Sequence, residues 1–168
     1  NTGTPPFLTA AEDVTTWTVM SYTALPSDYH MSYSPLDIAA LQYLYGPSLL
    51  TRTGNDTYKI SQIESNFIWD GIGTDTIDAS GLTQAATIYL TPGYWGFVGT
   101  KASTITSPGQ VTVNFGTTIE YLTGTSFDDH LYGNEVANVI NGGKGKDVIQ
   151  GWGGNDTLFG GGEDDELL

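Results

Sequence analysis

The stretch that decides the fold is residues 124–168, GTSFDDHLY GNEVANVIN GGKGKDVIQ GWGGNDTLF GGGEDDELL, five nine-residue units without remainder. A glycine opens each unit, an Asp or Asn stands sixth, and a Leu or Ile stands eighth. These columns are Gly124, Gly133, Gly142, Gly151 and Gly160; Asp129, Asn138, Asp147, Asp156 and Asp165; and Leu131, Ile140, Ile149, Leu158 and Leu167. Self-similarity at a fixed period predicts a solenoid whose units pack on their neighbours.

Each unit combines a turn with a short strand. The last three residues predict a strand whose single aliphatic side chain points inward, so that stacked units form a ladder of Leu and Ile. The first six residues predict a tight turn in which glycines adopt positive φ at little steric cost. That turn directs backbone carbonyls toward one point, where the sixth-column carboxylate joins them. Because calcium takes about 6–8 oxygen ligands, the pattern predicts calcium in the turns.

The units resemble the RTX nonapeptide G-G-x-G-x-D-x-U-x, where U is a large aliphatic residue, and unit 142–150 matches it completely. The resemblance implies a mainly β fold, a parallel β-roll (β-solenoid) in which alternate units share a face. Asp129, Asp147 and Asp165 are then expected along one edge, with Asn138 and Asp156 along the other. The further ligands implied in the turns are Gly142, Lys144, Gly145, Gly151, Gly153, Gly154, Gly160 and Gly162.

The repeat is imperfect in its fourth column, where Phe127, Val136 and Glu163 replace glycine. A left-handed conformation would cost such a residue about 1–2 kcal/mol. We therefore expect strong sites around Asp147, Asp156 and Asp165, and weak or absent binding near Val136. The alternative is a metal-free solenoid in which the Asp residues only shape turns; it is disfavoured because stacked carboxylates repel one another.

Composition points to cations as partners. Among 168 residues, 19 are Asp or Glu and 5 are Lys or Arg, a formal charge of −14. A field of that sign repels phosphate backbones and anionic lipid, so nucleic acid and membrane surfaces are not expected partners. The chain has no cysteine, which excludes disulfides and thiolate metal sites, and no apolar run of membrane-spanning length.

Upstream of the repeats, residues 34–46 predict a helix, with Ser34 as N-cap, Pro35 in the first position and Gly46 as the C-terminal stop. Its many apolar residues predict that most of it is buried. A change to short β-type runs near Pro47 marks a proposed boundary. The candidate strands are 57–60, 66–69, 86–90, 110–114 and 117–121. Residues 70–78, DGIGTDTID, repeat the nonapeptide chemistry.

The segment before the repeats resembles serralysin-type zinc metalloproteases, which are metzincins. TVMSY at 18–22 is similar to their Met-turn, and 37–46 is similar to the helix that closes their catalytic domain. TRTG at 51–54, the loop 69–75 and TIE at 118–120 follow in the family's order. The resemblance covers roughly residues 10–168. It implies three parts: the end of a catalytic domain (1–46), a β-rich part with calcium loops (47–123) and the roll (124–168).

The resemblance also implies roles for single residues. Met20 would form the floor beneath a zinc ion, and Tyr22 would ligate zinc and stabilise the developing oxyanion. The calcium ligands implied upstream of the repeats are Arg52, Gly54, Asp56, Asp70, Ile72, Gly73, Asp75 and Glu120. Ile72 departs from the family, which usually has glycine there.

Zinc catalysis in this family needs H-E-x-x-H-x-x-G-x-x-H, and the only histidines here are His30 and His130. We therefore expect a fragment that is inactive by itself, from a parent that hydrolyses peptides or proteins. The alternative is a non-catalytic calcium-dependent module of a secreted adhesin, lipase or epimerase. The acidic C-terminal part is expected to fold only on calcium, outside the cell, after one-step export without an N-terminal signal peptide.

Overall fold

The computed structural model describes residues 35–46, 48–50 and 52–168, and the chain divides into two compact units, Asn1–Gly46 and Pro47–Leu168. The described part of the first unit is helix α1 (Pro35–Tyr45). The strands of the second unit are β1 (Thr57–Lys59), β2 (Asn66–Ile68), β3 (Thr76–Asp78), β4 (Ala86–Tyr89), β5 (Trp95–Val98), β6 (Gln110–Val113), β7 (Tyr121–Thr123), β8 (His130–Asn134), β9 (Val139–Gly143), β10 (Val148–Trp152), β11 (Thr157–Gly161) and β12 (Glu166–Leu167).

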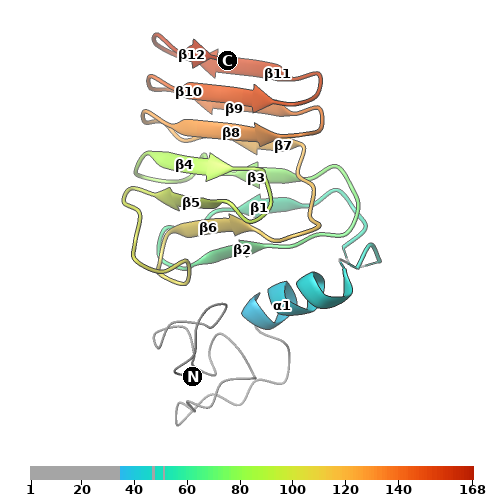
Figure 1. Cartoon of the computed structure of the whole chain (residues 1–168). Coiled ribbons are helices and arrows are strands. Elements are labelled where there is room, and N and C mark those ends of the chain that lie inside the picture. Colours follow the sequence, from blue (N-terminus) through green and yellow to red (C-terminus); the bar gives the residue numbers. More distant parts are fainter. Residues whose placement is uncertain (1–34, 47, 51) are drawn as a thin grey trace. The chain divides into compact units, whose positions relative to one another are not determined.

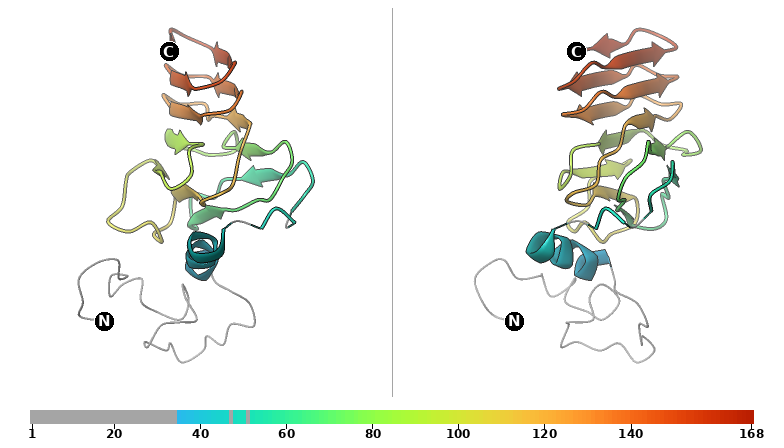
Figure 2. Two further views of the ribbon diagram at one scale, coloured as in Figure 1. Left: turned by 45° about the vertical axis from the view of Figure 1, so that its right-hand side comes forward. Right: turned by 90° about the vertical axis from the view of Figure 1, so that its right-hand side faces the viewer.

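The strands of the second unit form two sheets, and within each sheet the strands lie one above another (Figures 1 and 2). One sheet has the order β1-β3-β7-β9-β11 and is parallel throughout. The other has the order β12-β10-β8-β4-β5-β6-β2, and only β5 runs antiparallel to its neighbours. Because the chain alternates between the sheets from β7 onward, the predicted parallel β-roll is confirmed.

The core lies between the sheets and includes Leu131, Ile140 and Ile149 of the predicted aliphatic ladder, with Leu158 packed against it, whereas Leu167 is 46% exposed. In one sheet Ile88, Leu131 and Ile149 stand in register, and all three side chains are fully buried. In the other sheet Ile77, Leu122 and Ile140 do the same. Full burial of such a side chain contributes about 1.5–3 kcal/mol, so these ladders hold the roll together.

The strand predictions are largely confirmed, with one correction. The candidates at 57–60, 66–69, 86–90 and 110–114 correspond to β1, β2, β4 and β6. The candidate at 117–121 is wrong over most of its length, because β7 begins only at Tyr121. Its backbone and polar side chains serve other groups instead: Thr117 Oγ1 accepts from the Asp70 N–H, and the Ile119 carbonyl accepts from Asn134 Nδ2.

Helix α1 begins and ends where the sequence predicts. The Gly46 N–H donates to the Gln42 carbonyl at 2.9 Å, and Gly46 has φ of 82°, as a left-handed stop requires. The prediction that most of the helix is buried is wrong for the side chains that the structure describes. Leu44 and Tyr45 are 67% and 82% exposed, because no residue of the described part of the chain covers them. No helix among the described residues combines the length and the apolar character needed to cross a bilayer.

Candidate calcium sites

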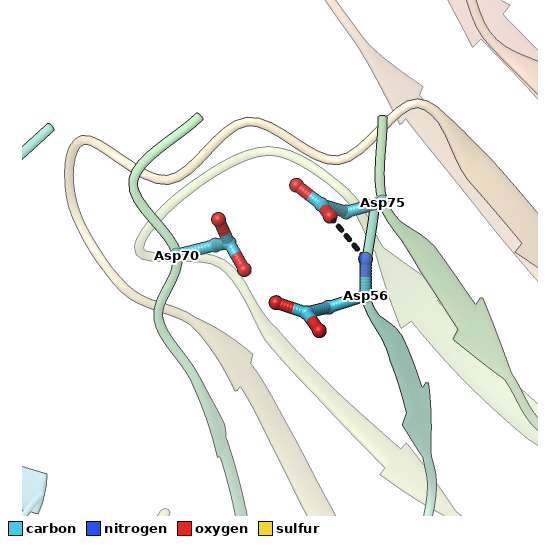
Figure 3. Close-up of side chains that lie close together, drawn as sticks. All are labelled: Asp56, Asp70 and Asp75. Atoms are coloured by element: carbon cyan, nitrogen blue, oxygen red, sulfur yellow. Dashed lines mark hydrogen bonds between the residues drawn. The ribbon is translucent and has the colours of Figure 1, made fainter. Parts of the chain in front are cut away.

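Three aspartates from separate segments converge upstream of the repeats. Asp56 precedes β1, Asp70 follows β2 and Asp75 precedes β3, and they offer carboxylate oxygens within 4.8 Å of one another. Figure 3 shows the three side chains directed toward one another. Asp70 and Asp75 are buried and Asp56 is half-buried. Buried like charges this close repel strongly in a medium of low dielectric constant, so the arrangement calls for a cation between them.

In the described part of the chain, the hydrogen bonds leave one fully buried oxygen of this cluster without a partner. Asp75 Oδ1 accepts from the Asp56 N–H at 2.8 Å, and Glu120 Oε2 accepts from the Asp75 N–H at 2.8 Å. Asp70 Oδ1 is buried without a hydrogen-bond partner among the described residues. Burial raises the pKa of the Asp75 and Glu120 carboxyls; repulsion from Asp70 and Asp56 adds to the effect at Asp75, and repulsion from Asp75 and Asp70 adds to it at Glu120. A carboxylate oxygen without a hydrogen-bond partner therefore lies beside carboxyl groups whose pKa values are raised. This is a suitable site for a hard cation such as calcium, which binds carboxylate oxygens.

The backbone segments 52–54 and 71–73 approach each other closely beside this cluster. The Arg52 carbonyl accepts from the N–H groups of Gly71 and Ile72 at 3.3 and 3.4 Å. A Cβ on Gly73 would lie 2.0 Å from the Gly54 carbonyl oxygen, so only glycine fits there. The loop thus gathers Arg52, Gly54 and Gly73 near the carboxylates, whereas the Ile72 side chain is 52% exposed.

The roll aligns its sixth-column residues along two edges, as predicted. On one edge Asp147 Oδ1 accepts from the Asp129 N–H at 2.8 Å, and Asp165 Oδ1 accepts from the Asp147 N–H at 3.0 Å. On the other edge Asp156 Oδ1 accepts from the Asn138 N–H at 2.8 Å. One oxygen of each carboxylate therefore ties together units that are 18 residues apart, and the other remains for the turn.

The last three turns, 142–147, 151–156 and 160–165, have the backbone of the complete nonapeptide, and we call them the open turns. Their second and fourth residues have positive φ: Gly143, Gly145, Trp152, Gly154, Gly161 and Glu163. Glu163 thus adopts the left-handed conformation that its position demands. In the first open turn, Asp147 Oδ2 is buried without a hydrogen-bond partner among the described residues. Burial and the neighbouring carboxylates of Asp129 and Asp165 raise the pKa of Asp147 to about 6.

The first two turns, 124–129 and 133–138, are built differently, and we call them the closed turns. In turn 124–129, Asp129 Oδ2 accepts from the Thr125 N–H at 2.6 Å, and Oδ1 accepts from the Thr125 hydroxyl at 2.9 Å and the Ala86 N–H at 2.7 Å. Thr125 Oγ1 in turn accepts from the Phe127 N–H. Phe127 therefore has no need of positive φ, and protein donors satisfy both oxygens of Asp129.

Turn 133–138 repeats this design with amides. Asn134 Oδ1 accepts from the Val136 N–H at 3.1 Å, and Asn138 Oδ1 accepts from the Asn134 N–H at 2.8 Å. Asn138 Nδ2 donates to the Ile119 carbonyl at 3.1 Å. Both the oxygen and the nitrogen of the Asn138 carboxamide are thus hydrogen-bonded, and the sixth position of this turn carries no carboxylate.

Sequence reasoning missed the two side chains that close these turns. Thr125 and Asn134 stand in the second column, where the nonapeptide has glycine. A hydroxyl or amide two residues before a non-glycine fourth residue is a recognisable signal, because such side chains cap the backbone two positions ahead. Met20, Tyr22 and His30 lie outside the described residues. His130 is exposed on β8, as its outward strand position predicts.

Comparison with known proteins agrees with this geometry. Residues 116–135 and 132–167 match the family model of the RTX calcium-binding nonapeptide repeat. The chain is 37% identical over 158 residues to the metalloprotease AprA of Pseudomonas entomophila, an alignment covering 79% of this chain and 31% of that protein. It is 38% identical over 142 residues to serralysin B of Dickeya chrysanthemi, covering 72% and 28%. The chain is a relative of the serralysins that carries RTX calcium-binding repeats.

Serralysin from Proteus mirabilis is a further relative, 35% identical over 151 residues, with 77% of this chain and 30% of that protein covered. The chain therefore spans about a third of the length of the relatives it matches. The alignments extend well beyond residues 116–167, so the likeness to the serralysins includes the segment before the repeats as well as the repeats themselves.

Proposed function

We propose that this chain is the calcium-binding C-terminal portion of a secreted, zinc-dependent endopeptidase of serralysin type, and that calcium folds and stabilises it after export. The observation that carries the proposal is the pair of orphaned, buried oxygens, Asp70 Oδ1 and Asp147 Oδ2, each placed among other carboxylates. Uncompensated charges in such places oppose folding, and a bound divalent cation reverses that cost.

The site assignment follows from the turn geometry. We assign calcium to the upstream cluster of Asp56, Asp70 and Asp75, with Glu120 beside it, and to the open turns with Asp147, Asp156 and Asp165. Backbone carbonyls of Arg52, Gly54 and the open-turn residues would complete the oxygen shells. Asp129 and Asn138 are assigned as structural residues, because protein donors already occupy their oxygens.

The protease part of the proposal rests on the likeness to the serralysins. Met20 and Tyr22 would contribute to a zinc site whose histidines this chain does not carry, so the chain by itself would not hydrolyse peptides. When bound in the intact parent, zinc would polarise the scissile carbonyl and activate water. We propose peptide or protein substrates for the parent, export without an N-terminal signal peptide, and no nucleic-acid or membrane partner.

The alternative is a calcium-dependent module of a secreted adhesin, lipase or epimerase. The alignments to metalloproteases before the repeats favour the protease. The coding sequence upstream of Asn1 tests this directly. An H-E-x-x-H-x-x-G-x-x-H motif is expected there, and its absence would leave the non-catalytic module as the better reading.

Calcium-driven folding is tested by circular dichroism during a calcium titration of chelator-treated chain. We expect a cooperative gain of β signal at submillimolar to millimolar calcium, because extracellular calcium must be able to drive folding. A β spectrum unchanged by chelator, from a sample that metal analysis finds free of calcium, would overturn the proposal in favour of a metal-free solenoid.

A further inference from the structure

The upstream cluster has a support that none of the repeat turns has, built from one tyrosine and one arginine. Tyr58 lies on β1 and its hydroxyl donates a hydrogen bond to Asp70 Oδ2. Arg52 Nη1 donates to the same hydroxyl oxygen at 3.3 Å. The guanidinium carbon of Arg52 lies 5.5 Å from the centroid of the Tyr58 ring and 4.8 Å from that of Trp69. The three side chains form one stacked group on the flank of Asp70.

The direction of the hydrogen bonds is fixed by chemistry. A guanidinium has only donors, so the Tyr58 oxygen must be the acceptor for Arg52. The single phenolic proton is then left for Asp70 Oδ2, which can only accept when ionised. Burial and the bond to Asp70 raise the pKa of Tyr58 to about 12, so the phenol remains a donor throughout the physiological range.

The rest of Asp70 is held as firmly. The Asp70 N–H donates to Thr117 Oγ1 at 3.0 Å, and the Thr117 hydroxyl donates to the Asp70 carbonyl at 3.4 Å. Asp70 is only 2% exposed. Its backbone and one carboxylate oxygen are therefore fixed, and the remaining oxygen is Oδ1, the orphan of the cluster.

We propose that Tyr58, oriented by Arg52, is a positioning residue that fixes the Asp70 carboxylate so that Oδ1 is presented, as a single ligand atom, to a calcium ion held by Asp56, Asp70 and Asp75. This inference rests on the proposed calcium function of the cluster. Without the phenol, the Asp70 carboxylate can turn, and binding must then order it. Partners behind a metal ligand raise metal affinity by about 10–100-fold for this reason.

Tyr58→Phe tests the proposal, because it removes the hydroxyl and keeps the ring beneath Arg52. The probe is Tb³⁺ as a substitute for calcium, followed by its luminescence during titration of the full chain, with calcium affinity confirmed by chelator competition. The component that disappears in Trp69→Phe reports the upstream cluster, because Trp69 adjoins Asp70. Tyr121→Phe is the matched control, since Tyr121 is an exposed tyrosine on β7 of the same sheet.

We expect Tyr58→Phe to weaken ion binding at the cluster about tenfold, with the far-UV spectrum and the remaining ions unchanged, and Tyr121→Phe to behave as the unmodified chain. Asp70→Asn should weaken binding at the cluster far more than Tyr58→Phe does, to an affinity that can still be measured, and adding Tyr58→Phe to it should cause no further loss. That non-additivity distinguishes positioning through Asp70 from a general structural role, which would add to the loss.

Two results separate failure of this inference from failure of the calcium site. Unchanged affinity in Tyr58→Phe, with binding strongly weakened in Asp70→Asn, overturns the positioning role and leaves the site intact. Unchanged binding in Asp70→Asn overturns the site, and the inference falls with it. If Tyr58→Phe fails to fold, Arg52→Met replaces it: the exposed guanidinium is lost, the phenol is free to turn away, and calcium affinity at the cluster is expected to fall. Wild-type affinity in Arg52→Met would contradict the orienting role.

Discussion

The closed turns and the open turns occupy equivalent places in one roll, but the two classes of turn are stabilised in different ways. Both are followed by a strand that carries one aliphatic residue of the ladder, and both align their sixth residue with the unit 18 residues away. In the closed turns, Thr125 and Asn134 supply the hydrogen bonds that the sixth residue needs. In the open turns a residue with positive φ stands at that place, and Asp147 Oδ2 is left unsatisfied among the described residues.

The difference indicates how the roll is put together. The closed turns adjoin the upstream strands, where the Ala86 N–H at the start of β4 donates to Asp129, so protein hydrogen bonds tie them to that part of the sheet. The open turns lie beyond them, and their aliphatic residues become less buried toward the end: Ile149 is fully buried and Leu167 is 46% exposed. We therefore expect the closed turns to serve as a base on which calcium extends the roll.

Of the changes considered, removal of calcium should produce the largest difference between the closed turns and the open turns. After chelation, the amides of β10, β11 and β12 are expected to lose hydrogen-exchange protection, because their turns then carry uncompensated carboxylates. The amides of β4, β7 and β8 should keep most of theirs. Hydrogen exchange with mass spectrometry, with and without calcium, measures both at once. Equal loss across all the strands would contradict a metal-independent base.

Substitution of one carboxylate in each class should separate their roles. Asp147→Asn is expected to lower calcium affinity at least about tenfold, because it removes the charge that an ion would neutralise. Asp129→Asn should leave the number of bound ions unchanged and should destabilise the chain by about 1–3 kcal/mol, since an amide nitrogen then faces backbone donors. Calcium titration and thermal unfolding of both variants distinguish the effects. A loss of one bound ion in Asp129→Asn would place calcium in the closed turn.

A closed turn should be convertible into an open one. The triple substitution Asn134→Gly, Val136→Gly and Asn138→Asp turns GNEVAN into GGEGAD, the complete nonapeptide turn. We expect about one additional calcium ion per chain and lower stability without calcium, because the capping hydrogen bonds are lost. Metal analysis gives the ion count. The single substitution Asn134→Gly is the control, since it opens the turn and supplies no carboxylate.

The sequence was sufficient for most of the fold because the roll is local and periodic. The glycine, Asp and aliphatic columns each follow from one unit's own turn and strand, and the buried Leu131, Ile140 and Ile149 confirm the inward direction of the aliphatic column in three units. The antiparallel strand β5 was not predicted, because the glycine-rich run around Trp95 resembles a loop until β4 and β6 pair with it. The opposite error occurred at residues 117–121, which were predicted as a strand. Their backbone groups instead bond to side chains that are distant in the sequence.

The candidate sites divide in the same way. The cluster of Asp56, Asp70 and Asp75 was within reach of sequence reasoning, because the resemblance to the serralysins placed all three together. The support from Tyr58 was not, because it depends on a contact across 12 residues between strand β1 and the loop that follows β2. The closed turns were anticipated only in part: the sequence predicted weak binding near Val136, but not the hydrogen bond by which Asn134 caps the Val136 N–H.

A change of pH should have the smallest effect on stability, and whether it raises or lowers the melting temperature depends on calcium. Burial and neighbouring carboxylates raise the pKa of Asp147 from 3.8 to about 6, so the folded metal-free roll binds this proton more tightly than the unfolded chain. Without calcium, the resulting stabilisation is full below about pH 4 and is lost as the pH rises through about 6. Lowering the pH from 7 to 5 should therefore raise the melting temperature of the chelated chain by a few degrees. With calcium present the same change should lower it, because protons then compete with the ion for the carboxylates.

Thermal unfolding at both pH values measures how the melting temperature changes with pH, with and without calcium. Asp147→Asn should flatten both of these slopes. Slopes of the same sign with and without calcium would contradict a shared site for proton and ion at the first open turn.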